Sequence, residues 1–292
     1  MASDGNSVTV FGDLSKPATV LIEKISGAVG ILFEPKRITR KAHAESEAKK
    51  ISALAELELT SELEQRAMTR LVHQEARKQK NIEDITSEAI AALPHDAKPE
   101  NLDEDWIALF FKECEVVSDK EMQSLWSKLL AFEATVPGTF SKRTISCVSA
   151  MSKRDAELFT NLCQFCWDVG GLTPLVFDEQ LPIYKDAGVT FTVLRHLEAV
   201  GLVTMDEMVI RRQERLQFSA TYFDSLINFD IPEKYLNRFP IGSVLLTSVG
   251  RELAPICGAK PNEHFMLWIL QKWTSEGCFV HSPYPRVMVC PP

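Results

Sequence analysis

The helical architecture of this chain is set by SDKEMQSLWSKLLA, residues Ser118–Ala131. Ser118 and Glu121 stand at the spacing of a capping box, in which two side chains satisfy backbone N–H groups at the start of a helix. The helix carries Trp126, a side chain of the kind that we expect to be buried in the core. The stretch carries no catalytic motif, so it predicts a packing element rather than an active site.

The composition is that of a soluble globular protein. The chain has 292 residues, 45% apolar and 25% charged, enough for one large domain or two ordinary ones. A net charge of −8 argues against non-specific coating of DNA, which needs a basic surface. Seven cysteines without a framework, no signal-peptide pattern and no apolar window long enough to span a bilayer predict a cytoplasmic location.

The region before this helix is expected to be helical. We predict a disordered polar tail over residues 1–16, followed over 17–93 by an amphipathic helix and a long helical arm. Apolar residues within 18–33 recur at the helical period. The segment after Lys36 is rich in Ala, Glu, Lys and Arg, which favour helices. The arm is expected to be a hairpin, or a bent helix that needs a partner.

Two capping signals divide the arm. Ser61 and Glu64 have capping-box spacing and predict a helix that runs to about Lys80. Asn81 and Asp84 are favoured N-cap residues and predict a separate, shorter helix that ends before Pro94.

Residues 94–171 are expected to form a helical core. Asp103 is predicted to cap one helix, and Ser152 with Asp155 to cap another. No strand-like alternation occurs before residue 171, where we place the domain boundary. The residues expected in this core are Trp106, Phe110, Trp126 and Phe159.

Residues 172–292 carry mixed helix and strand signals, which predict a small α+β domain. Thr190–Val200 is an amphipathic helix stopped by Gly201, and short strand-like runs follow it. The string LTSVGREL, Leu246–Leu253, resembles the start of the helix after the wing in winged-helix modules. The predicted fold class is mainly α, with an N-terminal amphipathic helix, a long helical arm, a helical core and a C-terminal α+β winged-helix-like domain.

The sequence shows no complete catalytic or metal-binding motif. Cys163 and Cys166 form the only C-x-x-C, and a zinc site would need two more ligands at suitable spacing. The pair falls inside a predicted apolar helix, so we expect both thiols to fill the core, with a metal or redox role as the alternative. The histidines are scattered, and no nucleophile elbow, Walker loop or dinucleotide fingerprint is present. We therefore expect no enzyme, no cofactor and no small-molecule substrate.

The segment 18–33 has two interpretations. Either it packs into the body or into an oligomer, or it lies on a membrane surface, because a basic flank follows its apolar face. The residues expected to meet a partner or lipid are Leu21, Ile22, Ile25, Val29, Leu32, Phe33, Lys36, Arg37 and Arg40.

Charge is unevenly distributed along the chain. Residues 34–80 hold eleven Lys or Arg against eight Asp or Glu, whereas residues 83–133 hold four against thirteen. The arm is thus mildly basic and the core acidic, which favours contacts of opposite charge within the chain or between subunits. A protein partner or a homo-oligomer is expected, and the basic excess is too small to predict a nucleic-acid patch.

A DNA-binding regulator is the alternative function. A winged-helix module reads DNA through basic residues on its recognition helix, and Thr190–Val200 offers only Arg195 and His196. Three residues on the following predicted hairpin are the candidate contacts to phosphate: Arg211, Arg212 and Arg215.

Several segments resemble one bacterial family. IEKISGAVG (Ile22–Gly30), FEPKRI (Phe33–Ile38), LWSKLL (Leu125–Leu130) and LTSVGREL (Leu246–Leu253) resemble the uncharacterised bacterial domain of unknown function family 2806. The WSKLLA run and the helix after it, Ser152–Cys166, are similar to the Abi-alpha group of abortive infection. The resemblance covers most of residues 15–275. Its motifs are structural, so it implies a bacterial protein with a place in anti-phage defence and carries over no catalytic residue.

The expected function is that of a non-enzymatic defence protein of the abortive-infection type. It is expected to act through self-association and through protein or membrane-surface binding. Its expected location is cytoplasmic, with peripheral contact at the inner membrane as the alternative.

Overall fold

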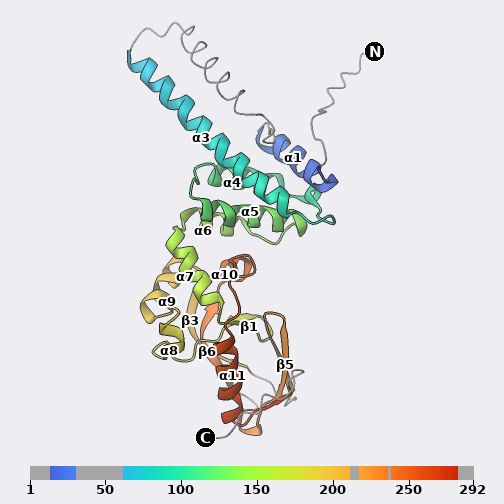
Figure 1. The fold of residues 1–292 in the computed structure, drawn as a ribbon, viewed down its shortest axis with the longest axis vertical. Coiled ribbons are helices and arrows are strands. Elements are labelled where there is room, and N and C mark those ends of the chain that lie inside the picture. Colours follow the sequence, from blue (N-terminus) through green and yellow to red (C-terminus); the bar gives the residue numbers. More distant parts are fainter. Residues whose placement is uncertain (1–13, 31–61, 211–216, 236–237, 282–292) are drawn as a thin grey trace. The chain divides into compact units, whose positions relative to one another are not determined.

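The computed structural model in Figure 1 describes residues 14–30, 62–210, 217–235 and 238–281. The chain divides into two compact units, Met1–Ser149 and Ala150–Pro292. The described part of the first unit is helical, and all described strands belong to the second. These features confirm a mainly helical protein with a C-terminal antiparallel sheet region.

The first unit is a set of helices around an aromatic core. Its elements are α1 (Lys16–Val29), α3 (Glu62–Ala92), the 3₁₀ turn η1 (Pro99–Asn101), α4 (Glu104–Cys114), α5 (Lys120–Thr135) and α6 (Lys142–Ala150). The Phe110 ring lies edge-on to Trp126 at 5.1 Å and stacks on Trp106 at 5.2 Å. All three are buried, as predicted. α5 packs on α3, and α1 packs on α4 and η1.

The start of α5 differs by one residue from the prediction. Asp119, rather than Ser118, is the N-cap, and its Oδ1 accepts hydrogen bonds from the N–H groups of Glu121 (3.1 Å) and Met122 (3.0 Å). The Ser118 hydroxyl instead accepts from the Asn81 amide at 3.2 Å. A carboxylate at the N-cap also stabilises the positive end of the helix dipole, which favours this choice.

α3 is one continuous helix, so the predicted break at Asn81 is wrong. The Asn81 side chain does not cap a helix; its Nδ2 donates to the Glu115 carbonyl at 2.9 Å. The tertiary contact overrides the local preference of Asn for a cap position. The predicted caps at Asp103 and at Ser152 with Asp155 are confirmed.

The second unit combines short helices with two antiparallel sheets. Its helices are α7 (Lys153–Cys163), α8 (Pro182–Lys185), α9 (Phe191–Val200), the 3₁₀ turn η2 (Glu233–Tyr235), α10 (Ser248–Leu253) and α11 (Glu263–Ser275). Its strands are β1 (Cys166–Asp168), β2 (Leu172–Pro174), β3 (Val203–Ile210), β4 (Gln217–Tyr222), β5 (Ser225–Asp230), β6 (Phe239–Leu246) and β7 (Phe279–His281). One sheet has the order β2-β1-β4-β5-β7, and β3 pairs with β6. Trp167, Phe229 and Trp273 lie in its core, with Trp273 stacked on Phe229 at 4.6 Å.

Gly250 explains why the LTSVGREL string contains a glycine. A Cβ at this position would lie 2.1 Å from the Leu202 carbonyl oxygen. Only glycine therefore lets α10 approach the chain at the start of β3 so closely.

The division between the units falls at Ser149, earlier than the boundary predicted at residue 171. α7 packs on α9, and β1 pairs with β2 and β4. The helix before the predicted boundary therefore belongs with the elements after it. Helical periodicity cannot show this, because it does not reveal which neighbour a helix packs against.

Candidate functional site

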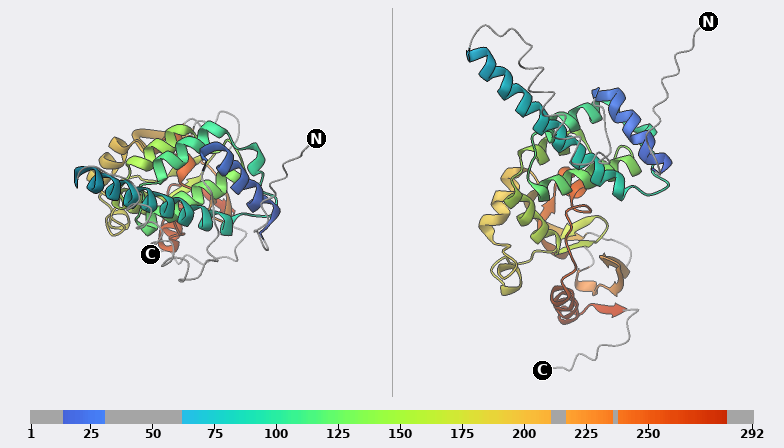
Figure 2. Two further views of the ribbon diagram at one scale, coloured as in Figure 1. Left: turned by 90° about the horizontal axis from the view of Figure 1, so that it is seen from above. Right: turned by 45° about the horizontal axis from the view of Figure 1, so that its top comes forward.

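The long helix α3 consists of two halves with different surroundings. Every buried residue of α3 lies between Asn81 and Ala89, and none lies between residues 62 and 80. Figures 1 and 2 show the N-terminal half extending beyond α4 and α5. We call residues 62–80 the free half and residues 81–92 the anchored half.

A buried amide network fixes the anchored half where the free half begins. Asn81 Nδ2 donates to the Glu115 carbonyl at 2.9 Å, and Gln123 Nε2 donates to Asn81 Oδ1 at 3.1 Å and to the Val117 carbonyl at 2.8 Å. Asn81 and Gln123 are both buried. Because buried amides are costly to leave unpaired, the network specifies one position of α3 on α5.

Ion pairs surround this network. Asp84 accepts from both Lys80 and Lys120 at 2.7 Å, and Lys78 lies 3.0 Å from Glu115. The hydrogen bond to Glu115, with a second to Glu75, raises the pKa of Lys78. Lys80 and Lys120 are exposed, whereas the Asp84 side chain is only 7% exposed, so these pairs fix the position of α3 against α5.

The free half carries an uncovered apolar strip. The side chains of Leu63 and Leu71 are 68% and 50% exposed, and Ala67 lies between them at helical spacing. On the helix this strip falls on the same side as Ile82 and Ile85, which are buried in the anchored half. The face that packs into the core thus continues along α3 without a covering element among the described residues.

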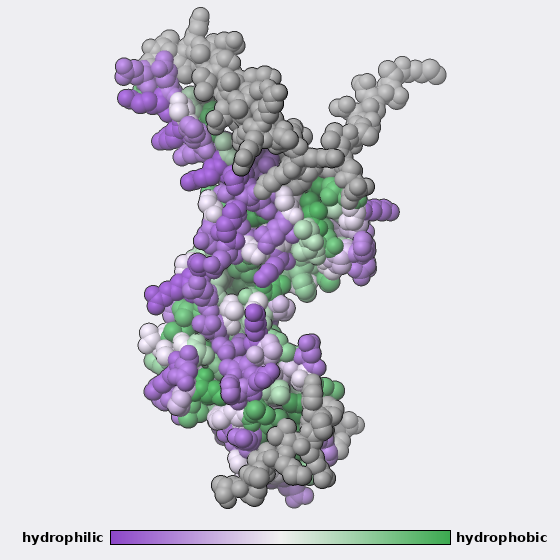
Figure 3. Space-filling model, viewed as in Figure 1, coloured by the Kyte–Doolittle hydropathy of each residue, from purple (hydrophilic) through white to green (hydrophobic). Residues whose placement is uncertain are grey.

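A second face of the free half is basic. Its residues recur at intervals of four, three and four, and all are exposed: Arg66, Arg70, His73 and Arg77. Arg66, Arg70 and Arg77 form no ion pair with another described residue. We call this set the basic stripe. Sequence reasoning missed it because a net count over 34–80 mixes all faces of the helix, whereas the helical spacing of the arginines separates them. Figure 3 shows the mainly hydrophilic surface of this part of the molecule.

The predicted partner-binding residues of α1 face inward. Leu21, Ile22 and Ile25 are buried where α1 packs on α4 and η1, and Val29 is half-buried. α1 begins after the Ser15 cap and ends at Gly30, whose φ of 67° suits glycine. The apolar face that the sequence offers to lipid is therefore used within the first unit.

The remaining predicted contact residues lie outside the described residues. They are Leu32, Phe33, Lys36, Arg37, Arg40, Arg211, Arg212 and Arg215.

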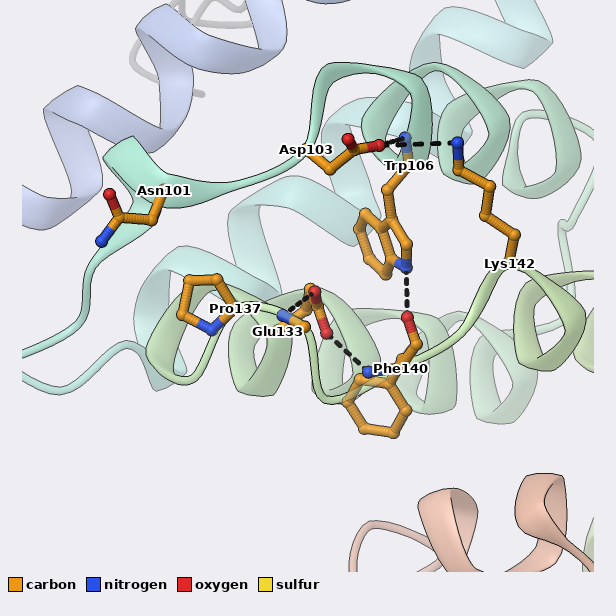
Figure 4. Close-up of a pocket in the computed structure, with 8 residues that line it drawn as sticks. Asn101, Asp103, Trp106, Glu133, Pro137, Phe140 and Lys142 are labelled. Carbon is orange, nitrogen blue, oxygen red and sulfur yellow. Dashed lines mark hydrogen bonds and ion pairs between the residues drawn. The ribbon is translucent and has the colours of Figure 1, made fainter.

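A cavity of about 530 Å³ lies beside Trp106 and contains one buried carboxylate (Figure 4). Glu133 is 3% exposed, and its two oxygens accept from the N–H groups of Gly138 (2.6 Å) and Phe140 (2.8 Å). The Trp106 indole donates to the Phe140 carbonyl at 2.8 Å. These polar groups hold the turn after α5 in place. The arrangement is that of a structural carboxylate rather than of an acid–base catalyst.

A Ser–Asp–His group occurs at the start of α7, but its order does not suit nucleophilic catalysis. The Ser152 hydroxyl donates to Asp155 Oδ2 at 2.8 Å, and His196 Nε2 lies 2.6 Å from Asp155 Oδ1. A catalytic triad needs the imidazole beside the hydroxyl. Partial burial raises the pKa of Asp155, but hydrogen bonds from His196 and Ser152 outweigh it and hold the pKa below its usual value.

The C-x-x-C pair bridges two elements. Cys163 is the last residue of α7, and Cys166 is the first of β1. The helix predicted to contain both ends between them, and both thiols are buried as predicted. Within the described ranges, no three His, Cys, Asp or Glu side chains are placed to hold a metal ion.

None of the described helices is both long and apolar enough to cross a membrane. The family model described as protein of unknown function (DUF2806) matches residues 65–269, well over half of the chain. No curated protein and no solved structure matches the chain. The matched region includes most of the free half, the aromatic core and the LTSVGREL glycine. The chain therefore belongs to the DUF2806 family, as the resemblance of its sequence predicted.

Proposed function

We propose that this protein acts without catalysis, by self-association through the free half of α3. The observation that carries the proposal is the uncovered apolar strip with Leu63 and Leu71, on a half-helix in which no residue is buried. Most of the stability of a helix in a protein comes from packing of one apolar face against other elements. The strip with Leu63 and Leu71 supplies an apolar face, and a partner packed against it would stabilise the free half.

Charge supports a second copy of this chain as the partner. The basic stripe is exposed, while residues 83–133 hold four Lys or Arg against thirteen Asp or Glu. Opposite charges on two surfaces of one chain favour contacts between copies and steer their encounter. A membrane surface is the weaker candidate, because Leu21, Ile22 and Ile25 would have to leave their contacts with α4.

The proposed setting is bacterial anti-phage defence of the abortive-infection type, in the cytoplasm or at the inner membrane. The support is the resemblance of residues 126–131 and 152–166 to the Abi-alpha group. Self-association is a suitable activity for such a protein, because assembly of copies through a surface needs no active site. Bacteria that express the protein should form fewer phage plaques, and a variant defective in assembly should lose that effect.

Light-scattering mass measurement tests the assembly. At high protein concentration the wild-type protein should have a mass of at least twice the 32.8 kDa of one chain. The double variant Leu63→Asp, Leu71→Asp should be a folded monomer, because it places charges on the strip. Leu226→Asp is the matched control: Leu226 is similarly exposed at 51%, but lies in the second unit. A monomeric wild type, or an assembled double variant, would refute the proposal. Ile25 is a poor probe because it is buried, so a charge there would disrupt the core.

A winged-helix DNA-binding regulator is the second candidate. It is supported by the order α8, α9, β3, β6, with β6 packed beside β2 and the Ser243 N–H donating to the Val176 carbonyl at 2.8 Å. The charge of α9 argues against DNA binding, because Arg195 forms an ion pair with Glu198. DNA binding that weakens with salt and with Arg211→Ala, Arg212→Ala would favour this candidate. No binding at low salt would remove it.

A further inference from the structure

The apolar strip of the free half has opposite charges on its two sides. At about 3.6 residues per turn, Arg66 and Arg70 of the basic stripe fall on one side of the strip. Glu64 and Glu75 fall on the other side. All four residues are exposed. The direction in which two strips pair therefore decides which charges come together.

The surroundings of α3 select an antiparallel pair, whose existence rests on the proposed function. In the anchored half, the face that continues the strip packs on α5 and α4. Two free halves that ran in the same direction would place the anchored half of each copy where α4 and α5 of the other copy lie. In the antiparallel arrangement, each anchored half lies beyond the N-terminal end of the other free half, so this collision does not occur.

An antiparallel pair brings the two basic stripes together. Its two-fold axis is perpendicular to the helices, so each side of one strip lies beside the same side of the other. With Ala67 beside Ala67 of the second copy, Arg66 of each copy comes close to Arg70 of the other. Each stripe extends from residue 66 to residue 77, about 16 Å along the helix. The arginines of both copies then form one basic surface.

We propose that this joined basic surface binds the phosphate backbone of a nucleic acid, in a site that is complete only when two copies pair. A nucleic-acid strand carries regularly spaced phosphates, which arginine binds well. Arg66, Arg70 and Arg77 form no ion pair with another described residue, so phosphate does not have to displace one. Because the whole chain has a net charge of −8, contact with phosphate is confined to the stripes.

The same geometry argues against a membrane surface as the ligand. An interfacial helix enters the lipid with an apolar face. In the antiparallel pair, the strip with Leu63 and Leu71 is used in the contact between the copies. The stripes therefore offer charge to the ligand without an apolar face beside it.

Nucleic acid should also strengthen the pairing. The arginines of the two copies repel each other, and a strand of phosphates across both stripes neutralises them. A ligand that binds the pair better than the single chain favours pairing by the same factor. At a protein concentration where the free protein is mainly monomeric, nucleic acid should therefore give complexes that contain two chains.

Fluorescence anisotropy and light-scattering mass measurement test the proposal on the full-length protein. The probes are a short labelled duplex DNA and a short labelled single-stranded RNA, and the tighter of the two identifies the source of the phosphates. If six arginines contact phosphate, the affinity should fall on the order of 10³-fold between about 50 and about 200 mM salt. Binding to vesicles of anionic lipid but to neither nucleic acid would overturn the proposal.

Arginine variants test the stripe itself. Arg66→Gln with Arg70→Gln should weaken nucleic-acid binding at least about tenfold, while the protein still associates at high concentration. Arg154→Gln with Arg251→Gln is the matched control, because both arginines are exposed but lie in the second unit. The control should bind as the wild type does. Undiminished binding without Arg66 and Arg70 would place the phosphates elsewhere and overturn the proposal.

Strip variants test the need for a second copy. Leu63→Gln with Leu71→Gln adds no charge, and it should be monomeric and bind nucleic acid at least about tenfold more weakly. Chains with Leu63→Cys, mixed with chains with Leu71→Cys and oxidised, should join the tryptic peptides 51–66 and 71–77, which contain no native cysteine. Unweakened binding by the monomeric variant, or a cross-link of Leu63→Cys to itself, would overturn the proposal.

The outcome for the wild type separates this site from the proposed function. A wild type that associates at high concentration but binds neither nucleic acid overturns the phosphate site and leaves the self-association intact. A wild type that stays monomeric at high concentration refutes both.

Discussion

Glu133 has a role that its residue type does not reveal. Its carboxylate accepts from two backbone N–H groups and is buried. We expect Glu133→Gln to lower the free energy of unfolding by about 1–3 kcal/mol, because the amide NH₂ would face an N–H group that needs an acceptor. Glu100→Gln, on the exposed turn η1, should change it little. Urea denaturation of the two variants decides the matter, and equal midpoints would show that the turn does not depend on the carboxylate.

The Asp155 carboxylate should make stability depend on acid pH. Its pKa is lower in the folded protein than the ordinary 3.8, because hydrogen bonds from His196 and Ser152 outweigh partial burial. A lowered carboxyl pKa stabilises the fold above the ordinary value, and this contribution is lost as the pH falls through the folded value. The stability difference between wild type and Asp155→Asn should therefore be larger at about pH 5.5 than at about pH 3. A difference that is constant across this range would contradict the assignment.

Single residues were predictable from sequence where the interaction is local. The caps at Asp103 and Ser152 lie within three residues of the groups they satisfy, so spacing alone identifies them. The hydrogen bonds of Asn81 and Glu133 were not predictable, because no local sequence pattern specifies where along the chain their partners lie. The same limit applies to Thr160, whose hydroxyl donates to the Cys257 carbonyl far along the chain.

At the scale of elements, α10 and the start of β3 approach too closely for a side chain at Gly250. We expect Gly250→Ala to destabilise the second unit by at least about 2 kcal/mol, because its Cβ would lie 2.1 Å from the Leu202 carbonyl. Gly27→Ala is the matched control: it lies in α1 with nothing near its Cβ, and alanine there should stabilise the helix by about 0.5–1 kcal/mol. Thermal unfolding of both variants measures the two effects. Equal stability of the two would mean that the close approach does not exist.

Helix content was predictable, but helix continuity was not. The residues of α3 favour a helix throughout, and the apparent break at Asn81 came from a residue whose side chain bonds to α5 and its preceding turn instead. The arm that includes the free half is predicted from sequence as a hairpin, or as a bent helix that needs a partner. Its two faces became distinguishable only once the anchored half showed which side enters the core.

At the scale of the whole molecule, the sequence indicated the class and order of the two parts, but placed the boundary too late. The composition shows that the chain is acidic overall, but it does not reveal the basic stripe. A sum over many residues contains no information about which face of a helix each charge lies on. The predicted binding residues of α1 are the clearest example. An amphipathic pattern shows that a face will be covered, and Leu21 and Ile25 are covered by the protein itself.

The most direct test of the account is amide hydrogen exchange across α3 at low and at high protein concentration. At low concentration, residues 62–80 should exchange much faster than residues 81–92, because only the anchored half is packed. At high concentration, exchange over 62–80 should slow by at least about tenfold as copies associate. If the protein gains mass on concentration while exchange over 62–80 stays fast, the free half is not the contact surface.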